Sequence, residues 1–219
     1  MSIRIVLVDD HEIVRDGLRA LLEKQADFEV VGEAHNGREA VRLVRRLRPH
    51  VVVMDVSMPD LNGAEATRRI LRESPSVRVT ALSMHSDRRF VDAMLGAGAR
   101  GYLLKDCAYQ ELVRAVRTVA DGHVYLSPQI ADLVVEQYGC QPAAVAETAA
   151  SASVLTPRER EVLQLLSEGH GTKQIAARLH VSARTIDTHR QNIMSNLDLH
   201  SVAELTKYAV REGLTSLEG

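Results

Sequence analysis

Short apolar runs alternate with longer amphipathic segments along the first half of the chain. Within those segments large apolar residues recur every three or four positions, as Val14, Leu18 and Leu21 do, which is the spacing of one helical face. This alternation predicts βαβ units around a parallel sheet. The expected strands are residues 3–8, 28–31, 50–55, 77–82 and 101–104, and the expected helices are residues 13–22, 36–48, 62–72, 86–97 and 109–120.

Five strands and five helices are the count of a flavodoxin-like, doubly wound α/β domain. After it, Ser127 as a cap and Pro128 as a first helical residue predict a helix to about Tyr138. Residues 139–153 are poor in large apolar residues and rich in Ala, Ser and Thr, so we interpret them as a linker. A continuous helix is the alternative, because Ala favours helix, although Gly139 and Pro142 count against it.

The remaining segment predicts an all-α domain. Thr156 with Glu159 forms a capping-box pattern around Pro157, and the pattern Ser201-Val202-Ala203-Glu204 forms a second one that opens a helix to Glu212. Thr172 is expected to cap a short helix, and Ser182 to cap a longer one that reaches about Leu197. A short helix, a turn and a longer helix make a helix-turn-helix pattern. We therefore divide the chain into residues 1–122, 123–153 and 154–219.

Polar residues with related chemistry follow four of the predicted strands. Asp9 and Asp10 follow the first, Asp55 ends the third, Ser83 follows the fourth and Lys105 the fifth. Ligands bind outside the carboxyl ends of parallel strands, so these side chains describe one site. Carboxylates at such short distances repel one another unless a cation lies among them, and oxygen ligands suit Mg²⁺. Ordinary polar residues facing solvent are the alternative, which the ordered set of five disfavours.

Together with Met58-Pro59, Gly63 and the run Gly101-Tyr102-Leu103-Leu104, this set resembles the receiver domain of two-component response regulators. The resemblance implies that Asp55 accepts a phosphoryl group from a sensor histidine kinase. It implies that Mg²⁺ is held by Asp10 and Asp55, with Asp9 acting through water and the backbone carbonyl of Ser57 as a further ligand.

The same resemblance implies roles for residues around the phosphoryl group. Lys105 would pair with the phosphoryl oxygens, and Ser83 would donate a hydrogen bond to one of them. Tyr102 matches the aromatic residue that swings inward on phosphorylation; a static edge-strand aromatic is the alternative. His85 and Ser57 flank the expected path of an attacking water, although His85 is equally well explained as a solvated loop residue.

Residues 154–219 resemble the LuxR-type helix-turn-helix of the NarL/FixJ family of response regulators. The segments that carry the resemblance are 155–163, 173–176 and 181–189. The implied recognition helix begins after Ser182, and its outward face carries Arg184, Asp187, Thr188 and Gln191. Such side chains can read base edges in double-stranded DNA. Lys173 and His189 are better suited to phosphates.

Charge gives no support of its own to DNA binding. From residue 154 onward eight Lys and Arg balance eight Asp and Glu, and the whole chain has a formal charge of -2. On the final helix Val202, Leu205 and Ala209 form a stripe, which by resemblance is a homodimer surface that forms when the protein is phosphorylated. Packing within the domain core explains the same stripe equally well.

Composition excludes several other classes of protein. Among the 219 residues no apolar stretch reaches the length of a membrane span, and the N-terminal residues begin a strand instead of a signal peptide, so we expect a cytoplasmic protein. Cys107 and Cys140 lack metal or redox spacing and are expected to be reduced thiols.

The pattern as a whole predicts a response regulator that controls transcription and is not an enzyme, beyond catalysing its own phosphotransfer and dephosphorylation. An aspartate-nucleophile phosphatase is one rival, but it would need a general acid two residues after the nucleophile, where Ser57 stands. A ligand-sensing LuxR-type regulator would lack the acidic set and Lys105. A regulator independent of phosphorylation is disfavoured by the intact acidic set.

Overall fold

A parallel sheet forms the centre of the N-terminal part of the chain. The computed structural model describes residues 2–107, 109–138 and 154–215. The strands are β1 (Ile3–Val8), β2 (Phe28–Ala34), β3 (Val51–Asp55), β4 (Arg78–Ser83), β5 (Gly101–Leu104) and β6 (Tyr125–Leu126). Their order is β2-β1-β3-β4-β5-β6, and each pair is parallel. The five predicted strands are confirmed; β6 has only two residues and gave no apolar run to detect.

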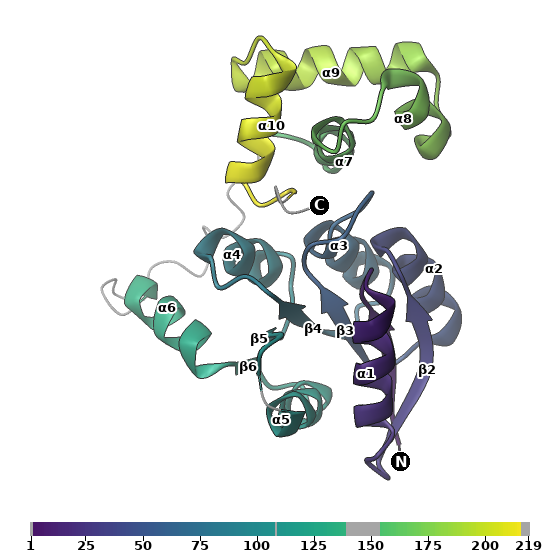
Figure 1. Ribbon diagram of the computed structural model, residues 1–219, viewed down its shortest axis with the longest axis vertical. Coiled ribbons are helices and arrows are strands. Elements are labelled where there is room, and N and C mark those ends of the chain that lie inside the picture. Colours follow the sequence, from purple (N-terminus) through teal and green to yellow (C-terminus); the bar gives the residue numbers. More distant parts are fainter. Residues whose placement is uncertain (1, 108, 139–153, 216–219) are drawn as a thin grey trace.

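Helices cover both faces of this sheet (Figure 1). The helices of this part are α1 (Glu12–Leu22), α2 (Gly37–Leu47), α3 (Gly63–Glu73), α4 (Arg88–Gly96), α5 (Tyr109–Ala120) and α6 (Pro128–Tyr138). Alternate residues of each strand face opposite layers, since Ile5 and Leu7 pack with α1 and α5 while Val6 and Val8 pack with α2, α3 and α4. The doubly wound α/β prediction is thereby confirmed, and strand order reverses between β1 and β3, where a site is expected.

The helix caps agree with the prediction at Thr156, Ser182 and Ser201 and differ at Thr172. Thr156 and Ser201 form the predicted capping boxes, and Asn62 and Ser182 cap through their side chains. Asn36 caps α2 through its side chain, and the Glu39 side chain accepts from the backbone of His35. The prediction that Thr172 caps its helix was wrong. Gly171 holds that position, with the Gln174 side chain accepting from its backbone N–H.

Four helices form the C-terminal domain around a separate apolar core. They are α7 (Pro157–Ser167), α8 (Thr172–Leu179), α9 (Ala183–Leu197) and α10 (Val202–Arg211). Ile175, Ile186, Ile193 and Leu205 are fully buried among them. α8 and α9 are the predicted helix-turn-helix, and His180 adopts a left-handed conformation (φ 54°) where α8 ends.

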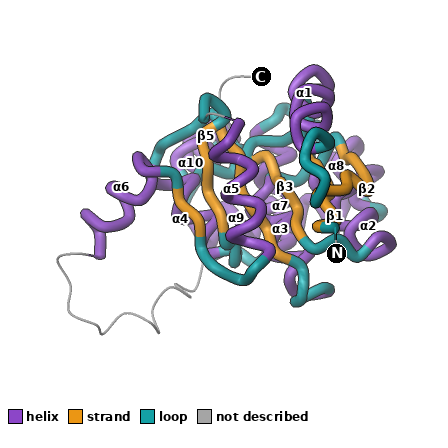
Figure 2. The backbone as a smooth tube through the Cα atoms, turned by 90° about the horizontal axis from the view of Figure 1, so that it is seen from below, coloured by secondary structure: helices purple, strands orange, loops and turns teal. Residues whose placement is uncertain are grey.

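The two domains contact each other mainly through α7, which faces α2 and α3, whereas α9 lies on the far side of the C-terminal domain (Figure 1). Arg178 on α8 also pairs with Asp60, and Arg89 on α4 donates to the Val210 carbonyl on α10. Figure 2 shows the same arrangement from below, with the strands of the sheet side by side between the helical layers. The predicted linker, residues 139–153, and Cys140 lie outside the described residues. Among the helices of the described part, none is both long and apolar enough to cross a membrane.

Candidate functional site

Two carboxylates and an ammonium group meet at the carboxyl ends of β1, β3 and β5, three of the central strands of the sheet. Asp9 follows β1, Asp55 ends β3 and Lys105 follows β5. The Nζ atom of Lys105 lies 2.7 Å from Asp9 Oδ2 and 2.9 Å from Asp55 Oδ2. Both carboxylates are buried, with 1% of Asp9 and 4% of Asp55 exposed. The parallel register of the strands therefore assembles the predicted residues, far apart in sequence, into one cluster.

The electrostatics of this cluster leave Asp55 unusually basic for a carboxylate. Burial raises the pKa of Asp55 from 3.8 to about 6, since the attraction of Lys105 only partly offsets burial and Asp9 raises it further. Burial alone would lower the pKa of Lys105, but Asp55 and Asp9 outweigh it and hold that pKa above its ordinary value. A carboxylate that is costly to ionise gains from any bound cation or from covalent modification.

The same strand ends can hold a metal ion. Ligand atoms of Asp9, Asp10, His11 and Asp55 all lie within 4.8 Å of one another. The Oδ1 atom of Asp10 is buried and accepts no hydrogen bond within the described part of the chain, while the imidazole Nδ1 of His11 lies 3.0 Å from it. Oxygen donors with an orphaned, buried atom fit a hard divalent cation. Sequence reasoning missed His11, although it directly follows the acidic pair.

The loop after β3 folds back against Asp55. The Ser57 backbone N–H points to Asp55 Oδ1 at 3.4 Å, and Gly63 N–H donates to the Val56 carbonyl at 2.9 Å. A Cβ atom on Gly63 would lie 2.1 Å from the Asp55 carbonyl oxygen, so only glycine permits this approach. The loop is therefore shaped directly around the residue that resembles a phosphoacceptor.

Ser83 and Tyr102 lie beside the cluster on β4 and β5. Ser83 is fully buried, and its hydroxyl accepts a hydrogen bond from the His85 backbone at 3.0 Å. The Tyr102 side chain is also fully buried and donates through its hydroxyl to the His85 carbonyl at 2.9 Å. Burial raises the pKa of Tyr102 to about 12, which keeps the hydroxyl a donor. His85 is half-buried, and its ring stacks on Phe90 with centroids 4.6 Å apart, so it is not a solvated loop residue.

The predicted DNA-reading residues differ in how freely their side chains reach solvent. Lys173, Arg184, Thr188 and Gln191 are exposed even though both domains are in contact. Asp187 is half-buried and accepts from the Thr172 hydroxyl at 3.4 Å, which ties the start of α8 to α9. His189 is also half-buried. Asp187 thus has a structural contact beside any role in reading bases.

The stripe on α10 divides between core and surface. Leu205 and Ala209 are fully buried in the core of the C-terminal domain, so their side chains are not available to a second chain here. The core-packing interpretation applies to these two, and the expectation that they form a dimer surface is corrected. Val202 is 46% exposed and remains a candidate for that surface. Periodicity identified the apolar stripe but not which of its residues are buried in the domain core.

Two family matches cover most of the chain. Residues 5–117 match the response regulator receiver domain, and residues 153–209 match the bacterial regulatory proteins of the luxR family. The transcriptional regulatory protein DegU of Brevibacillus brevis is 34% identical, over 97% of this chain and 94% of its own length. The response regulator UvrY of Escherichia coli K12 is 37% identical, over 99% of this chain and 97% of its own.

Solved structures agree with these matches. The response regulator ChrA of a heme-sensing two-component system is 33% identical with a TM-score of 0.53, covering 97% of this chain and 98% of its own. The response regulator RcsB in a DNA complex is 26% identical with a TM-score of 0.59, covering 97% of this chain and 99% of its own.

Proposed function

Because the chain belongs to the two-component response regulators that join a receiver domain to a LuxR-family helix-turn-helix domain, we propose that phosphorylation of Asp55 controls its binding to DNA. The observation that carries the proposal is the buried cluster of Asp55, Asp9 and Lys105. A cognate sensor histidine kinase supplies the phosphoryl group. The protein acts in the cytoplasm as a transcription factor.

Each residue of the cluster has a task in phosphoryl transfer. The carboxylate of Asp55 attacks phosphorus as the bond from phosphorus to the donor, the histidine of the kinase, breaks, and the acyl phosphate that forms retains the group. Negative charge gathers on the phosphoryl oxygens, and the Lys105 ammonium group, already within 2.9 Å of Asp55, stabilises it. The Ser83 hydroxyl exchanges its local contact for a phosphoryl oxygen. Tyr102 fills the space beside it and keeps the inward position.

Asp10 and Asp55 would hold Mg²⁺, with Asp9 acting through water and the Ser57 carbonyl as a further ligand. When bound there, the ion would neutralise part of the negative charge that phosphoryl transfer brings together. The orphaned Oδ1 of Asp10 supports this assignment. Asp9 already pairs with Lys105 at 2.7 Å, which supports an indirect role for it.

The output face is the exposed side of α9. Arg184, Thr188 and Gln191 reach base edges in the major groove, with Asp187 beside them, and Lys173 and His189 contact phosphates. Two such domains bind paired half-sites as a homodimer, which phosphorylation promotes and to which exposed Val202 contributes. The structure of a relative, RcsB, has been solved in a complex with DNA, which supports the proposal that this chain binds DNA.

Labelling tests the proposal directly. Wild-type protein with Mg²⁺ and acetyl phosphate, or a cognate kinase, is expected to gain one phosphoryl group, and Asp55→Asn is expected to abolish it. Asp121→Asn, an exposed position after α5, is the matched control and should label like wild type. Full labelling of the Asp55 variant would refute the assignment. A gel shift on one operator, with and without acetyl phosphate, then tests whether labelling controls DNA binding.

A further inference from the structure

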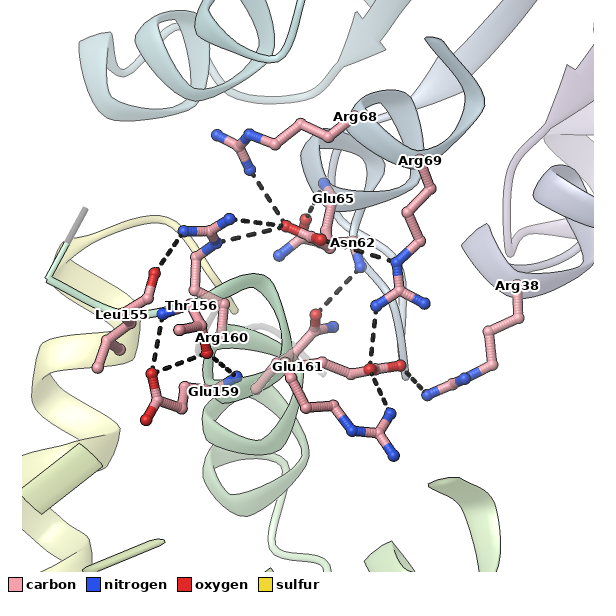
Figure 3. Close-up of polar contacts among 12 residues, drawn as sticks. Arg38, Asn62, Glu65, Arg68, Arg69, Leu155, Thr156, Glu159, Arg160 and Glu161 are labelled. Atoms are coloured by element: carbon pink, nitrogen blue, oxygen red, sulfur yellow. Dashed lines mark hydrogen bonds and ion pairs between the residues drawn. The ribbon is translucent and has the colours of Figure 1, made fainter. Parts of the chain in front are cut away.

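A buried carboxylate locks the two domains together (Figure 3). The Glu161 side chain on α7 is fully buried and faces three guanidinium groups. Arg38 on α2 and Arg69 on α3 come from the receiver domain, the latter at 3.0 Å, and Arg158 comes from α7 itself at 2.8 Å. Burial alone would raise the pKa of Glu161, but Arg69 and Arg38 outweigh it and hold that pKa below its ordinary value. A second ion pair between the domains joins Arg160 to Glu65 at 3.3 Å. We call the ion pairs of Glu161 and Glu65 across the domains the Glu161 lock.

A separate group of contacts joins α7 to the loop that follows the phosphoacceptor. The Gln164 side-chain amide donates to the Met58 carbonyl at 3.0 Å, and its oxygen accepts from the Asn62 backbone at 3.1 Å. The Glu168 carboxylate accepts from the Asp60 backbone at 3.3 Å and from the Gln164 amide at 2.8 Å. Only 1% of Gln164 is exposed, so its two bonds to the loop form away from water, where a lost partner is costly. We call this group, residues 164 and 168 with the loop backbone, the loop clamp.

The clamped loop is continuous with the Asp55 site. Ser57, the second residue after β3, points its N–H at Asp55 Oδ1, and Gly63 closes the loop against the Asp55 carbonyl. Between them Asp60 holds a left-handed backbone conformation (φ 68°), which few residues with a side chain adopt. Asp55 thus borders one end of a short, constrained loop whose middle is hydrogen-bonded to the other domain.

We propose that Gln164 is a positioning residue for the Asp55 site, through which domain docking and phosphorylation oppose each other; this rests on the proposed function. The clamp bonds that reach Met58, Asp60 and Asn62 are directional and match the present shape of the loop. A phosphoryl group on Asp55 displaces Lys105 from its bridge to Asp9 and moves the loop around Ser57. Any such shift lengthens clamp bonds, so phosphorylation weakens docking, and docking disfavours the phosphorylated state at equilibrium by the same factor. The rate of phosphorylation should fall in the same direction when the domains are docked.

This coupling differs from simple covering of the DNA-reading face. Arg184, Thr188 and Gln191 are exposed while the lock and the clamp are both formed. Docking therefore keeps the two domains from separating. Two recognition helices need that separation in order to reach two half-sites. The loop clamp makes docking depend on whether Asp55 is phosphorylated. The ion pairs of Glu161 strengthen docking but do not contact the loop.

The first experiment measures the initial rate of full-length phosphorylation by acetyl phosphate and Mg²⁺. Gln164→Met keeps the side-chain volume and removes both of its hydrogen bonds to the loop, and is expected to speed phosphorylation ~3- to 10-fold. Gln164→Ala should act in the same direction, and circular dichroism establishes that both variants fold. Gln110→Ala, at an exposed position on α5, is the matched control and should equal wild type.

The second experiment measures docking itself by energy transfer between dyes at Asp121→Cys and Lys207→Cys, with the native cysteines replaced by serine. KCl is set so that half of the wild type is docked, and beryllofluoride with Mg²⁺ mimics the phosphoryl group. The analogue should lower the docking constant several-fold in wild type. Glu161→Gln should lower docking with and without the analogue and keep that ratio, whereas Gln164→Met should bring the ratio close to one.

The outcomes separate the two proposals. If wild type is labelled but Gln164→Met shows the wild-type rate and the wild-type ratio, the positioning role is refuted and the proposed function stands. If Glu161→Gln removes the ratio while Gln164→Met keeps it, the lock and not the clamp carries the coupling, which also refutes the role of Gln164. If wild type accepts no phosphoryl group under any condition, the proposed function fails, and this inference fails with it.

Discussion

Removing the charge of Asp55 should stabilise the receiver domain when no metal is bound. Burial raises the pKa of this carboxyl from 3.8 to about 6 in the folded protein. A shift of roughly 2 units corresponds to about 3 kcal/mol, the free energy by which ionised Asp55 disfavours folding at pH 7. Asp55→Asn removes that cost and keeps the side-chain size, while Lys105 retains Asp9 as a partner. Because the buried amide loses some hydrogen bonding, we expect a net gain of about 1–3 kcal/mol.

The difference in unfolding free energy between wild type and Asp55→Asn should depend on pH. Since the folded pKa lies above the unfolded one, the favourable contribution of protonated Asp55 is complete below about pH 4. It is lost as pH rises through about 6, so wild type weakens over that window and the variant does not. The difference in unfolding free energy should therefore be small at pH 4.5 and reach its full size above pH 7.

Urea unfolding followed by circular dichroism, in EDTA between pH 4.5 and 8, measures this difference. Added Mg²⁺ should stabilise wild type and narrow the gap, because the ion offsets the repulsion that burial leaves uncompensated. A variant less stable than wild type at pH 7.5, or a difference independent of pH, would refute the account of Asp55 as an electrostatically costly buried acid. Asp121→Asn should show no effect and controls for removal of a negative charge.

Three further predictions concern the loop, the metal and the DNA face. Gly63→Ala should cost more than about 2 kcal/mol of stability because its Cβ would meet a β3 carbonyl at 2.1 Å, whereas Gly17→Ala, with open space on α1, should gain up to about 1 kcal/mol in the same thermal-unfolding assay. Asp10→Asn should raise the Mg²⁺ concentration for half-maximal phosphorylation, and an unchanged titration would remove it from the metal site. Lys173→Ala should weaken binding to all DNA sequences and lower the salt dependence, while Arg184→Ala should relax preference at particular base pairs; identical selection profiles for both would exclude Arg184 from base reading.

The amino-acid sequence by itself determined most of the secondary structure and the composition of the proposed phosphoryl site. Apolar runs that end in Asp9, Asp55 and Ser83 carry local information, because a parallel strand buried on both faces needs continuous apolar residues. The parallel topology then brings their ends to one edge, so the cluster follows from the order of the elements. Two-residue β6 and the Gly171 cap escaped detection because two residues have no periodicity and a glycine cap is a weak signal.

Only the tertiary structure decided which faces are covered and how the domains meet. Leu205 and Ala209 share a stripe with Val202, yet packing against α7 buries the first two and leaves the third exposed. Glu161 and Gln164 read as ordinary polar positions on an amphipathic helix, and nothing nearby in sequence marks them as buried. Their partners in the receiver domain lie more than 90 residues away, on α2, α3 and the loop before α3. Such contacts depend on the rigid-body placement of two separately folded domains, which local propensity and periodicity do not encode.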